Sequence, residues 1–144
     1  MRLKKAKKAD FEEIAKIYGE EFSKAPYNER WTDEKALSKI KTLSKYCDIW
    51  KIIYQNKIAG FIAINPNQWR PGETIFGEEM AIKSELQDKG IGTQTLKDIF
   101  RYYKKKGYKT FIGIINRNSK APGLCRKLGF SQSSENILIE GELK

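Results

Sequence analysis

The sequence predicts a single α/β (α+β) domain built on a mixed, mostly antiparallel central sheet with helices on both faces. At 144 residues the chain has room for one continuous hydrophobic core. Hydrophobic residues make up 40% of the chain and aromatic residues 12%, which is typical of a sequence that folds. Segments with strand-like and helix-like periodicity follow one another in the order β-α-α-β-β-β-α-β-α-β. Residues 1–144 are therefore predicted to form one domain.

The N-terminal part is predicted to contain an edge strand and two helices. The strand covers Arg2 to Lys8. Asp10 is a helix N-cap, and apolar residues follow it at helical spacing until Pro26 ends the helix. A second helix is capped by Thr32 or Asp33, and its apolar face consists of Ala36, Leu37, Ile40 and Leu43.

The middle of the chain is predicted to form a hairpin, a further strand and a long helix. The hairpin joins residues 49–54 to residues 58–64 through a short polar turn. The next strand covers residues 74–82. The helix begins near Thr95 and runs to about Lys106, where three lysines in the last turn suit the helix dipole.

The C-terminal part is predicted to contain two strands and a short helix between them. Residues 111–115 are apolar on both faces, which is typical of a buried central strand. The short helix covers about residues 120–128 and ends at Gly129. Residues 136–143 are expected to form the last strand.

The composition excludes several classes of function. Histidine is absent, which removes histidine-based triads and argues against a metal site. Two cysteines do not make a disulfide framework and favour a reducing cytoplasm. No apolar run approaches the roughly 20 residues that a bilayer span needs, so no membrane association is expected. Lys and Arg number 28 against 18 Asp and Glu, and the net charge of +10 favours anionic partners.

A glycine-containing loop lies between the predicted strand 74–82 and the long helix. It reads Gln87-Asp88-Lys89-Gly90-Ile91-Gly92-Thr93. A loop of this kind aims free backbone N–H groups and the positive end of a helix at one point, which suits a phosphate. A dinucleotide-binding loop is disfavoured because the expected third glycine falls on Thr95, and no Gly-Lys-Ser/Thr follows for a P-loop.

A second segment accompanies this loop. It begins at Asn116-Arg117-Asn118-Ser119-Lys120-Ala121 and ends at Leu128-Gly129-Phe130. The two motifs in this order, one strand apart, resemble the GCN5-related N-acetyltransferase family, and the predicted element order is similar to the fold of that family along nearly the whole chain. The resemblance implies acetyl-coenzyme A as cofactor. The residues that it assigns to the cofactor site are the strand residues Met80, Ala81 and Ile82 beside the pantetheine arm, Gln87, Asp88, Lys89, Gly90, Ile91, Gly92 and Thr93 around the pyrophosphate, and Asn118 near the thioester end.

Acyl transfer from a thioester to an amine also needs a base and a donor for the leaving thiolate. The resemblance favours an acidic residue on the strand before the loop, acting directly or through water. Glu78 and Glu79 are the candidates, and alternation along a strand places them on opposite faces, with Glu79 preferred. Cys125 occupies the position where the family commonly has a tyrosine as general acid. Its alternative role is packing, which is the usual one for a free cysteine.

The acceptor site is expected beside Tyr27 and Trp31, with Trp69 on another loop nearby. The run from Pro26 to Trp31 is similar to one in aminoglycoside 6′-N-acetyltransferase-like proteins. These features predict an N-acetyltransferase acting on a small-molecule or peptide amine, as a monomer or homodimer. The alternative is a non-catalytic coenzyme A-binding or sensing domain. A nucleic-acid-binding module is disfavoured because the basic residues are not interleaved with aromatic ones.

Overall fold

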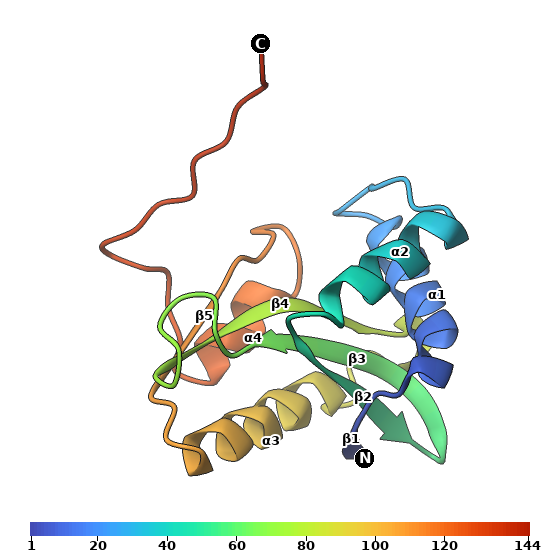
Figure 1. Cartoon of the computed structure of the whole chain (residues 1–144), viewed down its shortest axis with the longest axis horizontal. Coiled ribbons are helices and arrows are strands. Elements are labelled where there is room, and N and C mark those ends of the chain that lie inside the picture. The colour runs from blue at the N-terminus through green and yellow to red at the C-terminus, as the bar shows by residue number, and fades with distance from the viewer.

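A five-stranded sheet runs through the computed structural model, which describes residues 1–144 (Figure 1). Its strands lie in sequence order, and only the last pair is parallel, so the predicted mixed, mostly antiparallel sheet is confirmed. The strands are β1 (Arg2–Lys5), β2 (Asp48–Tyr54), β3 (Lys57–Asn65), β4 (Thr74–Ile82) and β5 (Thr110–Gly113).

Helices α1 (Phe11–Phe22) and α2 (Asp33–Leu43) cover one face of the sheet (Figure 1). Thr32 is the N-cap of α2, because its hydroxyl accepts a hydrogen bond from the amide of Lys35 at 3.2 Å. The apolar stripes of both helices pack on alternate strand residues, including Phe61 and Ala63 of β3.

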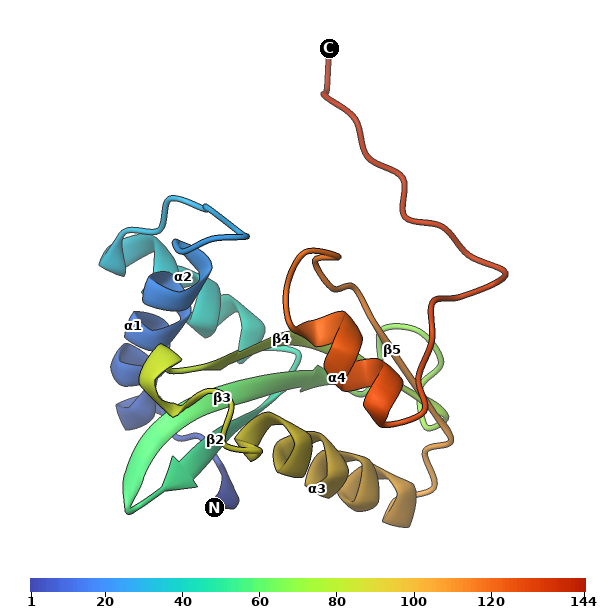
Figure 2. The same ribbon diagram turned by 180° about the vertical axis from the view of Figure 1, so that it is seen from behind.

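The opposite face is covered by α3 (Ile91–Lys105) and α4 (Ala121–Lys127), as Figure 2 shows. Here the intervening β3 residues Ile62 and Ile64 pack against α3. Successive residues of β3 thus pack into two hydrophobic layers, which explains why this strand is apolar from Ile58 to Ile64. Two 3₁₀ turns, η1 (Lys8–Asp10) and η2 (Ser84–Leu86), complete the fold. No helix is long and apolar enough to cross a membrane.

Two predicted boundaries were wrong. Strand β1 stops at Lys5 rather than Lys8, because the Asp10 carboxylate accepts the amide of Lys7 at 2.8 Å and turns the chain into η1. Helix α3 begins at Ile91, four residues before Thr95. Its first turn therefore includes the end of the glycine loop, which the sequence pattern placed outside the helix.

The predicted short helix is confirmed as α4, but the two strand predictions on either side of it were wrong. β5 ends at Gly113 and lies at the edge of the sheet, not at its centre. Residues 136–143 form no strand; they extend away from the body of the molecule and are exposed (Figures 1 and 2). Because no strand pairs with the outer edge of β5, that strand is only partly buried.

The buried hydroxyl of Thr95 in α3 has no hydrogen-bond partner. We expect Thr95→Val to raise the free energy of unfolding by about 1 kcal/mol, because it removes an unsatisfied polar atom while keeping the shape. Thr74→Val is the matched control, since the Thr74 hydroxyl lies 2.6 Å from that of Thr110 and its loss should destabilise the fold. Urea unfolding followed by circular dichroism measures both, and a destabilised Thr95→Val protein would contradict the prediction.

Candidate active site

The candidate site opens where β4 and β5 separate. The two strands pair only from Thr74 and Thr110 to Gly77 and Gly113. On its other side β4 stays paired with β3 as far as Ile82. The β4 edge that faced β5 is therefore unpaired from residue 78 to residue 82, and its backbone groups are available to an extended ligand.

A bulge in β4 lies at the same place. Ala63 of β3 faces Glu79 and the next residue faces Gly77, so Glu78 has no partner on β3. The bulge interrupts the alternation of side chains. Glu78 and Glu79 consequently border one cleft of about 130 Å³, and the expectation that they point to opposite faces was wrong.

The Glu79 carboxylate is the most perturbed acid of the site. Burial raises the pKa of Glu79 to about 7, and the nearby carboxylates of Glu29 and Glu78 act in the same direction. The ammonium of Lys39, 3.7 Å from Oε1 of Glu79, opposes this rise without cancelling it. Glu78 instead accepts a hydrogen bond from the amide of Asn65 at 3.3 Å. A carboxyl with a pKa near neutrality is suited to proton transfer at physiological pH.

Cys125 borders the same cleft from α4. Burial raises the pKa of the Cys125 thiol, so the group stays protonated at neutral pH. Pro122 lies in the first turn of α4, where its missing amide costs no helical hydrogen bond. The cleft is otherwise mostly apolar, with walls that include Phe22, Tyr27, Met80, Phe111, Ile115 and Leu124.

The glycine loop forms the N-terminus of α3 at one end of the unpaired β4 edge. Gly90 caps the helix with a φ of 80°, a left-handed conformation that glycine adopts without strain. None of the backbone amides of residues 88–93 donates a hydrogen bond within the chain. Six free amides at a positive helix end could hold a pyrophosphate, which fits the cofactor that the motif implies.

Side chains around the loop brace it and add a cation. The Gln87 amide donates to the Ile82 carbonyl at 2.8 Å and to the Glu21 carboxylate at 3.2 Å, which ties the loop to α1. The Lys120 ammonium lies 2.8 Å from Asp88 and 3.3 Å from the Gln87 side-chain oxygen. Lys120 thus places a positive charge beside the free amides. This position could not be predicted from the sequence, where the only signal is a lysine just before α4.

The other residues predicted to bind the cofactor do not all border the cleft. Met80 borders the cleft, whereas Ala81 packs under α1 and α2 and Ile82 packs near the start of α3. Asn118 is exposed and does not border the cleft. Asn116 does border it, and its side chain accepts the Asn118 amide at 2.8 Å. The sequence motif selects Asn118, three residues before Ala121, and gives no signal for Asn116, which lies five residues before it.

The three predicted acceptor residues do not gather at one point. Tyr27 borders the cleft and packs on Phe22 with a ring separation of 4.7 Å. Trp31 packs against Tyr18 at 4.7 Å and donates to Glu29 at 2.7 Å, so it closes the core beside the cleft. Trp69 is exposed on the β3–β4 loop and does not border the cleft.

Comparison with known structures places this arrangement in one class of folds. A possible acetyltransferase from Clostridium difficile 630 aligns with a TM-score of 0.82 at 15% identity, covering 99% of this chain and 98% of that one. The aminoglycoside N-acetyltransferase AAC(6′)-Iy in complex with CoA aligns with a TM-score of 0.73 at 13% identity, over 99% and 95% of the two chains. An aminoglycoside acetyltransferase from an uncultured soil metagenomic sample, in complex with sisomicin, gives 0.71 at 13% identity over 99% and 96%. A search of curated protein sequences found no significant match.

The fold and the free amides before α3 agree with the class of acyl-transferring enzymes that the two sequence motifs predict. The family model for the acetyltransferase (GNAT) family matches residues 11–130, so the chain belongs to that family. The protein is accordingly an N-acetyltransferase that uses acetyl-CoA.

Lys120 gives a test of the expected phosphate site, which consists of the free amides of residues 88–93 and the ammonium of this lysine. We expect Lys120→Ala to weaken CoA binding by about threefold to tenfold, because it removes one exposed charged contact to phosphate. Binding of pantetheine, which lacks the pyrophosphate, should not change. Isothermal titration calorimetry measures both ligands, and Lys127→Ala at the far end of α4 is the matched control. Equal losses for CoA and pantetheine would contradict the assignment of Lys120.

Proposed function

We propose that this acetyltransferase acetylates a primary amine of a small cationic molecule, with Glu79 as the base. The observation that carries the proposal is a carboxyl with a pKa of about 7 in the cleft where β4 and β5 separate. The ammonium form of an amine cannot attack an acyl group. A carboxyl that is about half ionised at neutral pH can remove the proton directly or through one water.

Bound acetyl-CoA supplies the acetyl thioester, and the chain positions and polarises it. The free amides of residues 88–93 and Lys120 are the groups that would hold the phosphates, and Gln87 keeps that loop against α1. Backbone N–H groups on the unpaired edge of β4 are the donors available to the acyl oxygen. Fixing both ends in this way brings the reacting groups together, which lowers the entropic part of the barrier.

Protons move between two sides of the cleft. The Glu79 carboxylate on β4 accepts one from the attacking amine. The Cys125 thiol on α4 stays protonated and can give its proton to the departing sulfur. Cys125 thus takes the role that a tyrosine has in the family pattern, with a lower reference pKa than tyrosine.

The acceptor class follows from the charge and size of the cleft. Glu78 and Glu79 border it together with the rings of Tyr27 and Phe22, a combination that suits a cationic amine. Its volume of about 130 Å³ admits an amino-bearing arm and not a folded protein surface. Structural neighbours named as aminoglycoside acetyltransferases support a small-molecule acceptor.

The proposal is tested with a panel of aminoglycosides, polyamines and short peptides, followed by thiol release from acetyl-CoA. With the best amine, we expect kcat/KM to rise with pH through a midpoint near 7, because only ionised Glu79 accepts a proton. Below that midpoint the rate should fall about tenfold per pH unit. Glu79→Gln should lose roughly 100-fold in kcat at pH 7 without losing CoA affinity.

Neighbouring charges provide the controls for this pH profile. Lys39→Met removes the cation that lowers the pKa of Glu79, so the midpoint should move to higher pH. Glu29→Gln removes a carboxylate that raises it, so the midpoint should move lower. A midpoint that ignores both substitutions would exclude Glu79 as the base, and absence of turnover on every amine would contradict the proposed acceptor class.

Cys125 is tested by paired substitutions. If its thiol protonates the leaving group, Cys125→Ala should lower kcat by at least about tenfold with little effect on KM. Cys125→Ser, which retains a proton donor, should keep more of the rate. Cys47→Ala is the control, because Cys47 is a half-buried cysteine near Glu78 and Glu79 that does not line the cleft. Unchanged kcat in Cys125→Ala would show that the thiol only packs against the cleft.

A further inference from the structure

Lys39 is the one lysine of α2 that is partly buried. The helix carries three lysines, and the other two, Lys35 and Lys41, are exposed. Lys39 lies three residues after the buried Ala36 and four before the buried Leu43, so it extends from the side of α2 that packs toward the sheet. This position brings its ammonium to β4, while the side chain stays 35% exposed and accessible.

The partner of this ammonium is the carboxylate that the proposed function assigns as the base. Nζ of Lys39 lies 3.7 Å from Oε1 of Glu79. Lysines form five ion pairs in the structure. The carboxylates of the other four pairs do not border the cleft; they belong to Asp10, Glu21, Asp48 and Asp88. Lys39 is therefore the lysine whose amine is paired with a carboxylate of the cleft.

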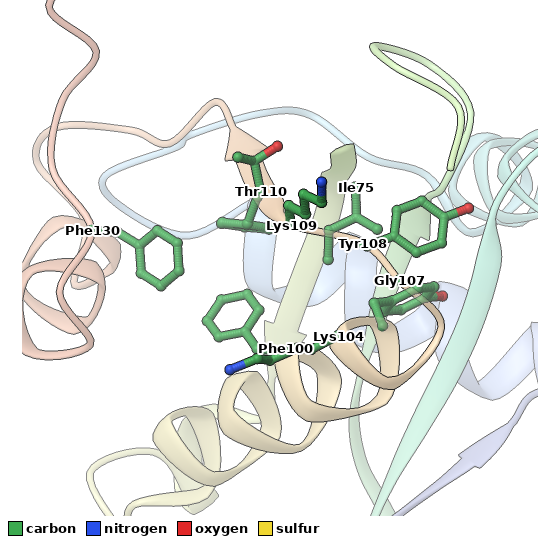
Figure 3. Close-up of a pocket in the computed structure, with 10 residues that line it drawn as sticks. Ile75, Phe100, Lys104, Gly107, Tyr108, Lys109, Thr110 and Phe130 are labelled. Carbon is green, nitrogen blue, oxygen red and sulfur yellow. The ribbon is translucent and has the colours of Figure 1, made fainter. Parts of the chain in front are cut away.

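The lysines at the larger cavity of the molecule have no such neighbour. This cavity has a volume of about 560 Å³ and lies between β5 and the C-terminal end of α3. Figure 3 shows Lys104 and Lys109 beside it, together with Phe100 and Phe130. None of the residues that line this cavity is acidic, so it offers no carboxylate base to either amine.

Lys39 and Glu79 stand in the relation that acetyl transfer requires of an acceptor and its base. An attacking amine must lie within a hydrogen bond, or one water, of the group that removes its proton. The flexible stem of a lysine allows its amine to move over such a short range. Glu79 also belongs to residues 78–82 of β4, whose unpaired edge is where the proposed function places the acyl group. An amine already attached to the protein beside this edge has a high effective concentration.

We propose that Lys39 is a site of self-acetylation, to which the enzyme transfers the acetyl group of its own bound acetyl-CoA. The inference rests on the proposed function, because Glu79 again acts as the base. The Glu79 carboxylate takes one proton from the Lys39 ammonium, and the free amine forms a bond to the acetyl carbon. The C–S bond breaks and its electron pair stays on the sulfur. The nitrogen loses a second proton as the amide forms, and the sulfur takes up a proton. The products are acetylated Lys39, CoA and one proton that Glu79 returns to water.

Acetylation of Lys39 removes a positive charge from the surroundings of Glu79. Burial, Glu29 and Glu78 raise the pKa of Glu79, and the Lys39 ammonium opposes them. The other titratable side chains near this carboxyl are neutral at pH 7, because burial raises the pKa of each; they are Tyr18, Tyr46 and Cys47. Without the ammonium the pKa of Glu79 is higher, so a smaller fraction of the base is ionised at pH 7. Self-acetylation therefore slows the acetylation of other amines at neutral pH.

The experiment incubates the full chain with acetyl-CoA and no added amine, and follows the mass of the intact protein. We expect one acetyl group per chain, which peptide mapping locates at Lys39, and a rate constant that does not depend on protein concentration. Glu79→Gln should slow this reaction by roughly 100-fold. Lys39→Arg keeps the positive charge and should give no product at this position. Lys41→Arg, on the exposed side of the same helix, is the matched control and should be acetylated like the unmodified protein.

Exposed lysines distinguish this reaction from uncatalysed acetylation. Direct attack of accessible amines on acetyl-CoA predicts that Lys35 and Lys41 react at least as fast as Lys39, and that Glu79→Gln changes nothing. That pattern would overturn the proposal. A rate constant that rises with protein concentration would overturn it as well, because it means transfer between copies.

The amine panel separates a failure of this inference from a failure of the proposed function. Amine acetylation that depends on Glu79, with Lys39 left unmodified, would exclude self-acetylation and keep Glu79 as the base. If Glu79→Gln slows neither reaction, the assignment of the base is wrong. With the best amine, prior incubation with acetyl-CoA should move the midpoint of kcat/KM to higher pH in the unmodified protein and not in Lys39→Arg.

Discussion

The early end of the pairing between β4 and β5 is the constraint on which the rest of the site depends. The strands meet for four residue pairs and part after Gly77 and Gly113. The ring of Phe111 lies over Gly77, and a Cβ at that position would be 2.8 Å from it. Glycine is therefore needed for the strands to approach here, and the next residue of β4 is the bulged Glu78. One local arrangement thus creates the opening, frees a strand edge inside it and turns two carboxylates toward it.

Groups of opposite charge lie in different places around this opening. One end holds two carboxylates, of which Glu79 has a pKa raised to about 7 by burial. The free amides before α3 and the ammonium of Lys120 lie beyond it, past the end of the unpaired β4 edge. In the proposed reaction the cationic amine would be attracted to the carboxylates and the anionic cofactor to the amides and Lys120, so the field would orient the two substrates before any chemistry takes place. The overall charge of +10 does not describe this polarity, because the site depends on where a few charges are buried.

Much of the fold could be predicted because periodicity records which face of an element is buried. Residues 74–82 were predicted as a strand and form β4 with the same bounds, and Thr32 was one of two predicted caps for α2. The free amides of the glycine loop at the start of α3 could be predicted from the motif, because they belong to the backbone. Side-chain contacts between distant residues could not be predicted. Gln87 is held by Glu21, 66 positions earlier in the chain, and no local pattern records that contact. The bulge at Glu78 depends on the register with β3, which the local pattern does not contain.

The two strand predictions that failed have a common physical origin. Residues 111–115 are apolar on both faces, as in a strand with neighbours on both sides, yet β5 has a neighbour on one side only. Residues 136–143 have the composition of a strand, yet they have no strand to pair with. Residue types reflect the surroundings of a segment in the assembled protein, and a single chain need not provide those surroundings.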